Sequence, residues 1–404
     1  MRATTLFNRL LPLQGLSIRG FRFEGGSLVL EAHRTFRLLC CPRCGATRRG
    51  RESAHLRSWR HWSVWGQEIV IEAEIRRFRC RPCDAVVTEA VPWARHDSAF
   101  TTQFEDAVAL LAQQTNRTAV AALTGVAWAT VGNITERVVG EHLDPRRLDN
   151  LTRIAVDEVS YRKHHRYLTV VTDHVTRRVV WIAEGKSSET LGSFFDLLGK
   201  EACERIVLVT MDMSAAYIQA VTEKLKNAKI AFDHFHIVKL ANEALDKVRR
   251  GLVREAEGDD KKALKGTRWA LLHRMDNVPE KYHPVLEMLT PDSPLGRAYL
   301  LKESLLDILR DREATGREPL DGWLAWAARS KLSSFVTLGQ TLRSHMDGTL
   351  TFMKERLTNG LAEGMNNKIR VLTHRAYGFH SAASLVATIF LCCAGITLPH
   401  LQLL

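Results

Sequence analysis

Short apolar runs rich in valine and isoleucine recur through the middle of the chain and predict a buried sheet. Two runs lie within residues 152–172, and others cover residues 179–183, 206–211 and 229–232. Helical spacing of apolar residues at 214–225 separates the last two runs. Strands that are followed by alternating helix and strand are typical of a mixed α/β sheet, which we predict here.

Helical spacing dominates much of the remaining chain. Residues 104–114 predict a helix with Thr101 or Thr102 as its N-cap, and residues 385–396 predict a final apolar helix. From residue 237 to about residue 340 the pattern is almost entirely helical and rich in Lys, Arg and Leu. Because such a long helical tract fits poorly inside a compact sheet domain, we interpret it as an insertion.

A helix-turn-helix is predicted before the sheet. Residues 116–134 combine a short helix of small residues, a turn at Gly125 and a second helix. Thr130 and Asn133 would lie near the start of the recognition helix, where side chains reach base edges. An ordinary helical bundle would show the same short pattern.

Two Cys-x-x-Cys pairs characterise the N-terminal region, which otherwise predicts strands at residues 27–33 and 68–78. The pairs are Cys41-Pro-Arg-Cys44-Gly and Cys80-Arg-Pro-Cys83. Their matched spacing can give the tetrahedral thiolate set of a structural Zn²⁺ site. Four unrelated free cysteines are the alternative. The expected spare thiol is Cys40, and the side chains that could compete as ligands are His55 and His61.

Arginines and three tryptophans, Trp59, Trp62 and Trp65, surround these cysteines. Arginine contacts phosphate and aromatic rings stack on bases, so this module could bind a nucleic-acid backbone. The tryptophans would serve equally well as the core of a small domain.

The length and charge of the chain indicate several domains and a negatively charged partner. A chain of 404 residues is long enough for two or three domains, and its net charge of +12 points to a polyanion, although a solvated basic face would give the same total. No apolar run reaches the roughly 20 residues that a membrane span needs. The N-terminus lacks the apolar stretch of a signal peptide, so we expect a cytoplasmic protein without a membrane partner.

Carboxylates follow two of the predicted strands. Asp157 ends the first apolar run, and Asp212 ends the fourth. Acids at the ends of adjacent strands can converge and hold a pair of divalent cations. The alternative is that each aspartate caps a following helix.

A third acid, Glu363, lies between two glycines on a predicted helix. It shares a helix face with Asn366, Asn367 and Arg370, which follow at i+3, i+4 and i+7. This setting indicates the close approach of an anionic partner.

With these residues, the chain resembles the bacterial insertion-sequence transposases of the DDE type, most closely the ISL3 family. Besides the two cysteine pairs, the segments that carry the resemblance are Ala155-Val-Asp157-Glu, Val209-Thr-Met-Asp212-Met-Ser, Asp233-x-Phe-His236-x-x-Lys239, Asn359-Gly-x-x-Glu363-Gly-x-Asn-Asn-Lys and Arg375-Ala-Tyr-Gly-Phe. They occur in order over nearly the whole chain.

The resemblance implies a multidomain α/β protein with an RNase H-like catalytic core. Its expected parts are a zinc-binding module (1–95), a helix-turn-helix domain (96–148), the first part of the core (149–250), the helical insertion (251–345) and the second part of the core (346–404). It also implies double-stranded DNA as the partner, both terminal inverted repeats and target, bound by a homo-oligomer that is at least a dimer.

The implied site roles follow the same motifs. Asp157 would bridge two Mg²⁺ (or Mn²⁺) ions, with Asp212 and Glu363 each favouring one. The expected DNA contacts are Arg117, Thr130, Asn133, Arg137, Asn366, Asn367, Lys368 and Arg370, and the expected accessory residues are Asp233, His236 and Trp323.

Two other functions remain open at this point. One is a DNA-binding regulator derived from a transposase, against which the three intact acids argue. The other is a stand-alone RNase H-like nuclease such as a resolvase, against which the separate zinc and helix-turn-helix modules argue.

Overall fold

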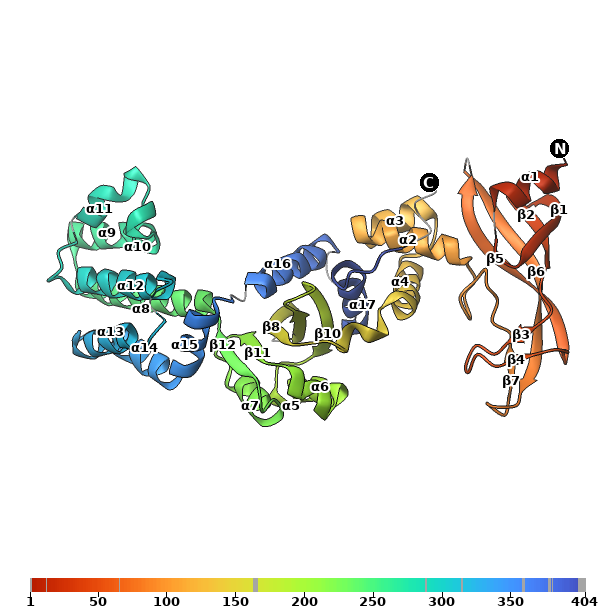
Figure 1. The fold of residues 1–404 in the computed structure, drawn as a ribbon. Helices are drawn as coiled ribbons and strands as arrows, with labels where there is room; N and C mark the ends of the chain where they lie inside the picture. Colours follow the sequence, from red (N-terminus) through yellow and green to blue (C-terminus); the bar gives the residue numbers. More distant parts are fainter. Residues whose placement is uncertain are drawn as a thin grey trace. The chain divides into compact units, whose positions relative to one another are not determined.

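The computed structural model describes residues 2–11, 13–64, 66–162, 166–287, 289–313, 315–357, 360–376, 379 and 381–398 (Figure 1). The chain forms two compact units. One comprises Met1–Asp144 together with Leu372–Leu404, and the other comprises Pro145–Val371. The last part of the chain therefore belongs with its beginning.

A five-stranded sheet opens the first unit, with the order β1-β2-β6-β5 and β7 paired to β6. Its elements are α1 (Ala3–Leu10), β1 (Leu16–Glu24), β2 (Ser27–Arg34), β5 (Ser53–Val64), β6 (Gln67–Cys80) and β7 (Ala85–Thr88). The alternating residues Ile69, Ile71, Ala73 and Ile75 of β6 are buried, which gives the sheet one apolar face. The two strands predicted at 27–33 and 68–78 are confirmed, whereas β1 and β5 were not predicted.

The tryptophans of this region are structural where they are described. Trp59 is 1% exposed and meets Trp93 edge to face, with 5.5 Å between ring centroids. Trp62 is half-buried against Phe104. Trp65 lies outside the described residues. The core alternative is therefore confirmed for Trp59.

Three helices follow the sheet, namely α2 (Thr102–Gln114), α3 (Arg117–Thr124) and α4 (Trp128–His142). Thr101 is the N-cap of α2, and its side chain accepts a hydrogen bond from the Phe104 backbone N–H. Gly125 ends α3 with φ +66°, a left-handed conformation that glycine adopts without steric cost. The predicted helix–turn–helix geometry is thus present.

The C-terminal helix α17 (Ala382–Cys393) packs on these helices. Leu391 and Ile396 join the apolar core of α2 and α4, and Gln113 Nε2 donates to the Leu391 carbonyl over 2.8 Å. The sequence assigns residues 346–404 to the second part of the α/β core. In the structure, apolar side chains of residues 390–398 are buried against the helix-turn-helix.

The second unit contains a mixed sheet with the order β10-β9-β8-β11-β12. Strands β8 (Arg153–Arg162), β9 (Arg166–Asp173) and β10 (Arg178–Glu184) are antiparallel, and β11 (Leu208–Met211) and β12 (Lys229–Phe232) run parallel to β8. All five predicted strands are confirmed. Helices α5 (Ser188–Leu198) and α7 (Ala215–Lys224) share an apolar core with the sheet, and α6 (Lys200–Arg205) and the 3₁₀ turn η1 (Pro145–Leu148) complete this part.

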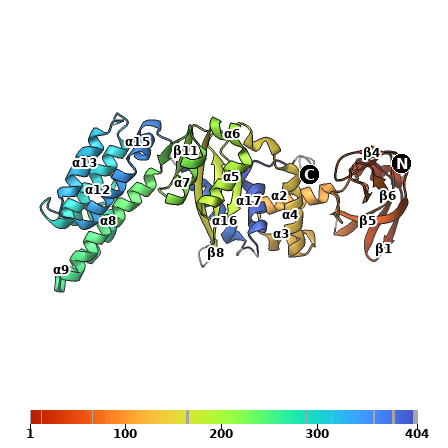
Figure 2. The same cartoon turned by 90° about the horizontal axis from the view of Figure 1, so that it is seen from below.

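The predicted helical tract is confirmed and begins directly after β12. Its longer helices, α8 (His234–Glu255), α12 (Pro294–Arg310), α13 (Glu318–Arg329) and α14 (Ser333–Ser344), pack around one apolar core (Figure 2). The shorter elements are α9 (Gly258–Gly266), α10 (Arg268–Leu272), η2 (Met275–Asn277), η3 (Glu280–Tyr282), α11 (His283–Glu287) and α15 (Met346–Glu355). The chain then returns to the α/β part through α16 (Gly360–Arg375).

Across the described ranges, no single helix combines the length and apolar character of a membrane span. Helices α3 and α4 pass that test only as a pair, and they are bent by 102° at the break between them.

Candidate functional site

The register of the parallel strands sets three aspartates in a row. Leu208 pairs with Arg153 and Thr210 with Ala155, and the same register continued by two residues puts Asp212 level with Asp157. On the other side, Phe232 pairs with Met211, so Asp233 is level with Asp212. Neighbouring strands lie about 4.8 Å apart, so the three carboxylates start from adjacent backbone positions.

Asp157 is not at a strand end, contrary to the prediction. Strand β8 continues to Arg162 because residues 157–162 still pair with β9. On the β11 side the pairing stops at Ala155. Asp157 therefore lies where β8 loses its parallel neighbour, which leaves that edge open beside the carboxylate.

Helix α16 brings Glu363 to the same place. Asp157, Asp212 and Glu363 line one cavity of about 760 Å³. Its walls also carry Glu158, Asp233, His236, Asn366 and Arg370 and, from the helical insertion, Lys239, Asn242, Glu243, Asp246, Arg249, Arg250 and Arg268. The structure thus joins acids from β8, the end of β11 and one distant helix, and basic side chains of α8, α10 and α16 line the same cavity.

Hydrogen bonds hold both carboxylate oxygens of Asp157. The Glu158 backbone N–H donates to Oδ1 over 2.7 Å, and the Asn366 side-chain Nδ2 donates to Oδ2 over 2.7 Å. Burial raises the pKa of Asp157 to about 6, the Glu158 N–H opposes this change, and the charge of Asp212 adds to it. The cavity therefore disfavours an ionised Asp157 unless a positive charge is present.

Asp212 and Asp233 also serve the following helices. Asp212 Oδ1 accepts from the Ser214 N–H over 3.1 Å at the start of α7. Asp233 is the N-cap of α8, accepting from the Phe235 N–H, and its Oδ2 lies 3.1 Å from His236 Nδ1. The hydrogen bond that His236 makes to the Asp233 carboxylate raises the pKa of His236, so this side chain keeps a positive charge more readily.

The four cysteines of the N-terminal module converge. The Sγ atoms of Cys41, Cys44, Cys80 and Cys83 all lie within 4.8 Å of one another. Cys41 and Cys44 flank the turn of the hairpin β3 (Leu39–Cys40) and β4 (Thr47–Arg48), and the second pair lies at the β6–β7 turn. Within the described ranges this is the only group of three or more His, Cys, Asp or Glu side chains assembled to hold a metal ion. Cys40, His55 and His61 are not part of it.

Two predicted DNA contacts of the recognition helix remain accessible. Asn133 is exposed and Thr130 is half-buried, in the first two turns of α4. They keep the position that base-reading side chains occupy in a helix-turn-helix.

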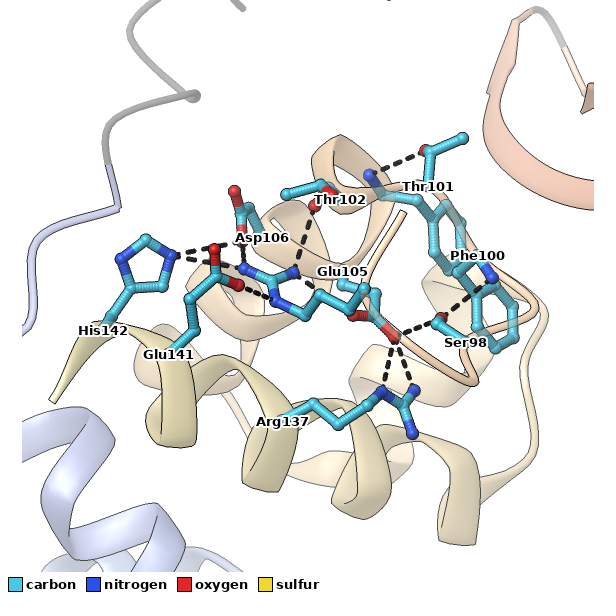
Figure 3. Close-up of polar contacts among 11 residues, drawn as sticks. Ser98, Phe100, Thr101, Thr102, Glu105, Asp106, Arg137, Glu141 and His142 are labelled. Carbon is cyan, nitrogen blue, oxygen red and sulfur yellow. Dashed lines mark hydrogen bonds and ion pairs between the residues drawn. The ribbon is translucent and has the colours of Figure 1, made fainter. Parts of the chain in front are cut away.

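Arg117 and Arg137, which the sequence predicts as DNA contacts, bond to acceptors inside the first unit. Arg137 Nε donates to Glu105 Oε1 over 2.9 Å, and Glu105 is fully buried (Figure 3). Arg117 is 6% exposed and donates to the Ser384 carbonyl and to Thr388 Oγ1, each over 3.2 Å. Both guanidinium groups therefore have acceptors within the first unit, while the Arg137 side chain keeps 30% of its surface exposed.

The residues of α16 that the sequence predicts as DNA contacts lie on different faces of the helix. Asn366 is buried at the acidic cavity, and Arg370 lines the same cavity. Lys368 lines a second cavity, of about 550 Å³, together with Arg177. Asn367 is exposed.

Trp323 does not reach the acidic cavity. It is 2% exposed, and its indole N–H donates to the Leu301 carbonyl over 2.8 Å within the helical core. Trp323 thus packs in the helical core, and the accessory role expected for this residue stays a prediction.

Sequence reasoning missed the cavity wall that the insertion supplies. Arg249 and Arg268 come from α8 and α10, and only Lys239 had been quoted in a motif. The available signal was the helical spacing of Lys239, Asn242, Asp246 and Arg249 after His236, which places them on one face of α8.

Comparison with known proteins matches three segments. Residues 37–83 match the zinc-finger of transposase IS204/IS1001/IS1096/IS1165, residues 89–139 the helix-turn-helix domain of transposase family ISL3, and residues 154–389 the DDE transposase domain of the ISL3 type. A transposase for insertion sequence element IS1557 from Mycobacterium tuberculosis (strain CDC 1551 / Oshkosh) is 37% identical, over 98% of this chain and 96% of that protein. A transposase for insertion sequence element IS1001 from Bordetella parapertussis is 30% identical, over 88% of this chain and 89% of that protein.

Proposed function

Because the chain belongs to the ISL3 family of insertion-sequence transposases, we propose that Asp157, Asp212 and Glu363 are its catalytic residues. The protein is an enzyme that binds DNA and catalyses strand cleavage and strand transfer in transposition. One observation carries the residue assignment. These three acids, which come from β8, the end of β11 and α16, line a single cavity.

We propose that the mixed sheet with α5, α7 and α16 is an RNase H-like catalytic core. The helical insertion separates β12 from α16, yet α16 returns to the cavity that the strands define. Acids that are distant in sequence and share one cavity support a single catalytic domain built from both segments.

The residues present fit a pair of divalent cations, Mg²⁺ or Mn²⁺. Burial and the neighbouring Asp212 disfavour the charge of Asp157, and a bound cation would remove that penalty. Carboxylate oxygens are ligands that Mg²⁺ accepts. Cations held by Asp157, Asp212 and Glu363 would supply the Lewis acidity that phosphodiester cleavage requires.

The cations that line the cavity suit the DNA strand that is cut. Lys239, Arg268 and Arg370 are exposed and line the cavity, so we propose that they neutralise phosphates on either side of the scissile bond. We also propose that His236, whose positive charge Asp233 favours, contacts the same strand. These contacts orient the phosphodiester, and orientation is a large part of catalysis in such reactions.

We propose that the first unit recognises the terminal inverted repeats of the element. In this proposal a zinc ion on the four cysteines would hold the two hairpin turns, and Thr130 and Asn133 of α4 would read base edges. Both ends of an element have to be cut, so we further propose that at least two copies of the chain act together on DNA.

Gel-resolved nicking of a labelled element end tests the catalytic assignment. We expect Asp157→Ala, Asp212→Ala and Glu363→Ala to bind the end as the wild type does, and to cut at least about a thousandfold more slowly. Mg²⁺ and Mn²⁺ should support cutting, whereas Ca²⁺, with its looser geometry, should permit binding with little turnover. Glu243→Ala is the matched control, because Glu243 is an exposed acid of the same cavity. An alanine variant of the three acids that cuts as fast as Glu243→Ala would remove that acid from the catalytic set.

A further inference from the structure

Asn366 joins the helix that carries Glu363 to the strand that carries Asp157. Its side chain is 4% exposed and lines the catalytic cavity. The amide Nδ2 donates to Asp157 Oδ2 over 2.7 Å, while the Glu158 backbone N–H donates to Asp157 Oδ1 over 2.7 Å. Each oxygen of Asp157 is therefore held by a donor from a different element, which fixes the plane of the carboxylate.

The chemistry of the side chain determines how it is oriented. An ionised carboxylate only accepts hydrogen bonds, so the amino group of Asn366 and not its carbonyl oxygen must face Asp157. This orientation leaves Asn366 Oδ1 buried without a partner among the described residues. An aspartate at position 366 would place a second negative charge there without a donor, and leucine, of similar volume, would leave Asp157 Oδ2 unbonded.

We propose that Asn366 is a positioning residue that acts through Asp157. A carboxylate has about four lone-pair positions, two on each oxygen. Asn366 and Glu158 occupy one position on each oxygen of Asp157, so the remaining lone pairs keep a fixed direction for cation binding. The inference rests on the proposed function, because it takes Asp157 to be a cation ligand.

This role differs from the DNA contact that the sequence predicts for Asn366. A DNA contact would need an exposed amide, and the exposed amide of this pair belongs to Asn367. Asn366 is buried on the side of α16 that faces β8, so substitution should change cation binding in the absence of DNA.

Mn²⁺ affinity of the DNA-free full-length protein, measured by calorimetry, tests the inference. We expect Asn366→Leu to weaken Mn²⁺ binding by roughly 10- to 100-fold, because losing a hydrogen-bond partner of a metal ligand commonly lowers metal affinity by that factor. The electron paramagnetic resonance spectrum of bound Mn²⁺ should also change, because Asp157 Oδ2 is no longer held in place by the Asn366 amide. A residue that merely supports packing would leave the spectrum of the bound ion unchanged.

Three further variants make the outcome decisive. Asn367→Leu is the matched control on the neighbouring exposed position and should bind Mn²⁺ as the wild type does. Asn366→Ser, whose side chain is too short to reach Asp157, replaces the leucine variant if the latter does not fold. If both Asn366 variants bind as tightly as the wild type while Asp157→Ala does not, the positioning role is wrong. If Asp157→Ala also binds as the wild type does, the proposed cation site itself fails.

Discussion

A buried ionic cluster between α2 and α4 allows a quantitative prediction. Arg95, whose side chain is 8% exposed, contacts Asp106 Oδ1 over 2.6 Å and Glu105 Oε2 over 3.2 Å, and it also pairs with Glu141 (Figure 3). Both Glu105 and Asp106 are fully buried. One guanidinium therefore compensates two carboxylates that have no access to water.

Replacing Arg95 by methionine keeps most of the side-chain volume and removes the charge. Glu105 would retain Arg137 and the Ser98 hydroxyl, which donates to Oε1 over 2.7 Å. Asp106 would be left with His142 at 3.8 Å, and its Oδ2 already has no hydrogen-bond partner among the described residues. Breaking a buried pair in this way costs about 3–5 kcal/mol, because it leaves an uncompensated charge.

Hydrogen exchange in the full-length chain measures this cost locally. A loss of about 3–5 kcal/mol should speed the exchange of protected amides in α2 by a factor of roughly 150 to 5,000. Arg79→Met is the control, because the Arg79–Asp84 pair has exposed side chains at 58% and 84% and should contribute less than about 1 kcal/mol. If Arg95→Met exchanges no faster than Arg79→Met, the cluster does not stabilise the helix-turn-helix and the reasoning is refuted.

Three other outcomes are expected. Metal analysis should find one zinc per chain, lost in Cys80→Ser and kept in Cys40→Ser, and retention in both would contradict the ligand set. In competition binding, Asn133→Ala should reduce the ratio of affinities for element ends and random DNA by about tenfold or more. Arg117→Met should instead weaken binding to both DNAs equally, because it lowers the stability of the helix-turn-helix. Burial lowers the pKa of His61 to about 4 from 6.5, so the unfolded chain binds more protons between these values. The contribution of neutral His61 to the free energy of unfolding should be fully present above about pH 6.5 and should fall by up to about 3 kcal/mol towards pH 4. His61→Gln should therefore flatten this part of a profile of denaturation midpoint against pH. An unchanged profile would contradict the reasoning.

The sequence predicted the elements that carry a strong local signal. The Val- and Ile-rich strands, the N-cap at Thr101 and the turn at Gly125 all rest on residues within a few positions of one another. Strand β5 was missed because its Arg, His and Trp residues do not alternate simply with apolar ones. Its antiparallel pairing with β6, the next strand along the chain, holds β5 in an extended conformation that its own sequence pattern does not indicate.

Partners that are distant in sequence explain why the contacts of Arg117 and Arg137 could not be predicted from the sequence. The role of Arg137 depends on Glu105, which lies on α2 and is buried only when the helices pack. The role of Arg117 depends on Ser384 and Thr388 at the other end of the chain. An arginine on a helix has the same local sequence signal whether it pairs with a buried acceptor or faces DNA, so only the tertiary structure separates the two.

The capping alternative for the strand-end aspartates can now be judged residue by residue. Asp233 caps α8 and binds His236, so helix capping accounts for its position. Asp212 accepts one N–H at the start of α7 through Oδ1, and that bond leaves Oδ2 for another partner. Asp157 has no following helix to cap, because β8 continues past it as a strand paired with β9. A half-buried carboxylate in mid-strand that is level with a second one is costly unless something positive binds there. Helix capping therefore does not account for the position of Asp157, and this residue carries our proposal of a cation site.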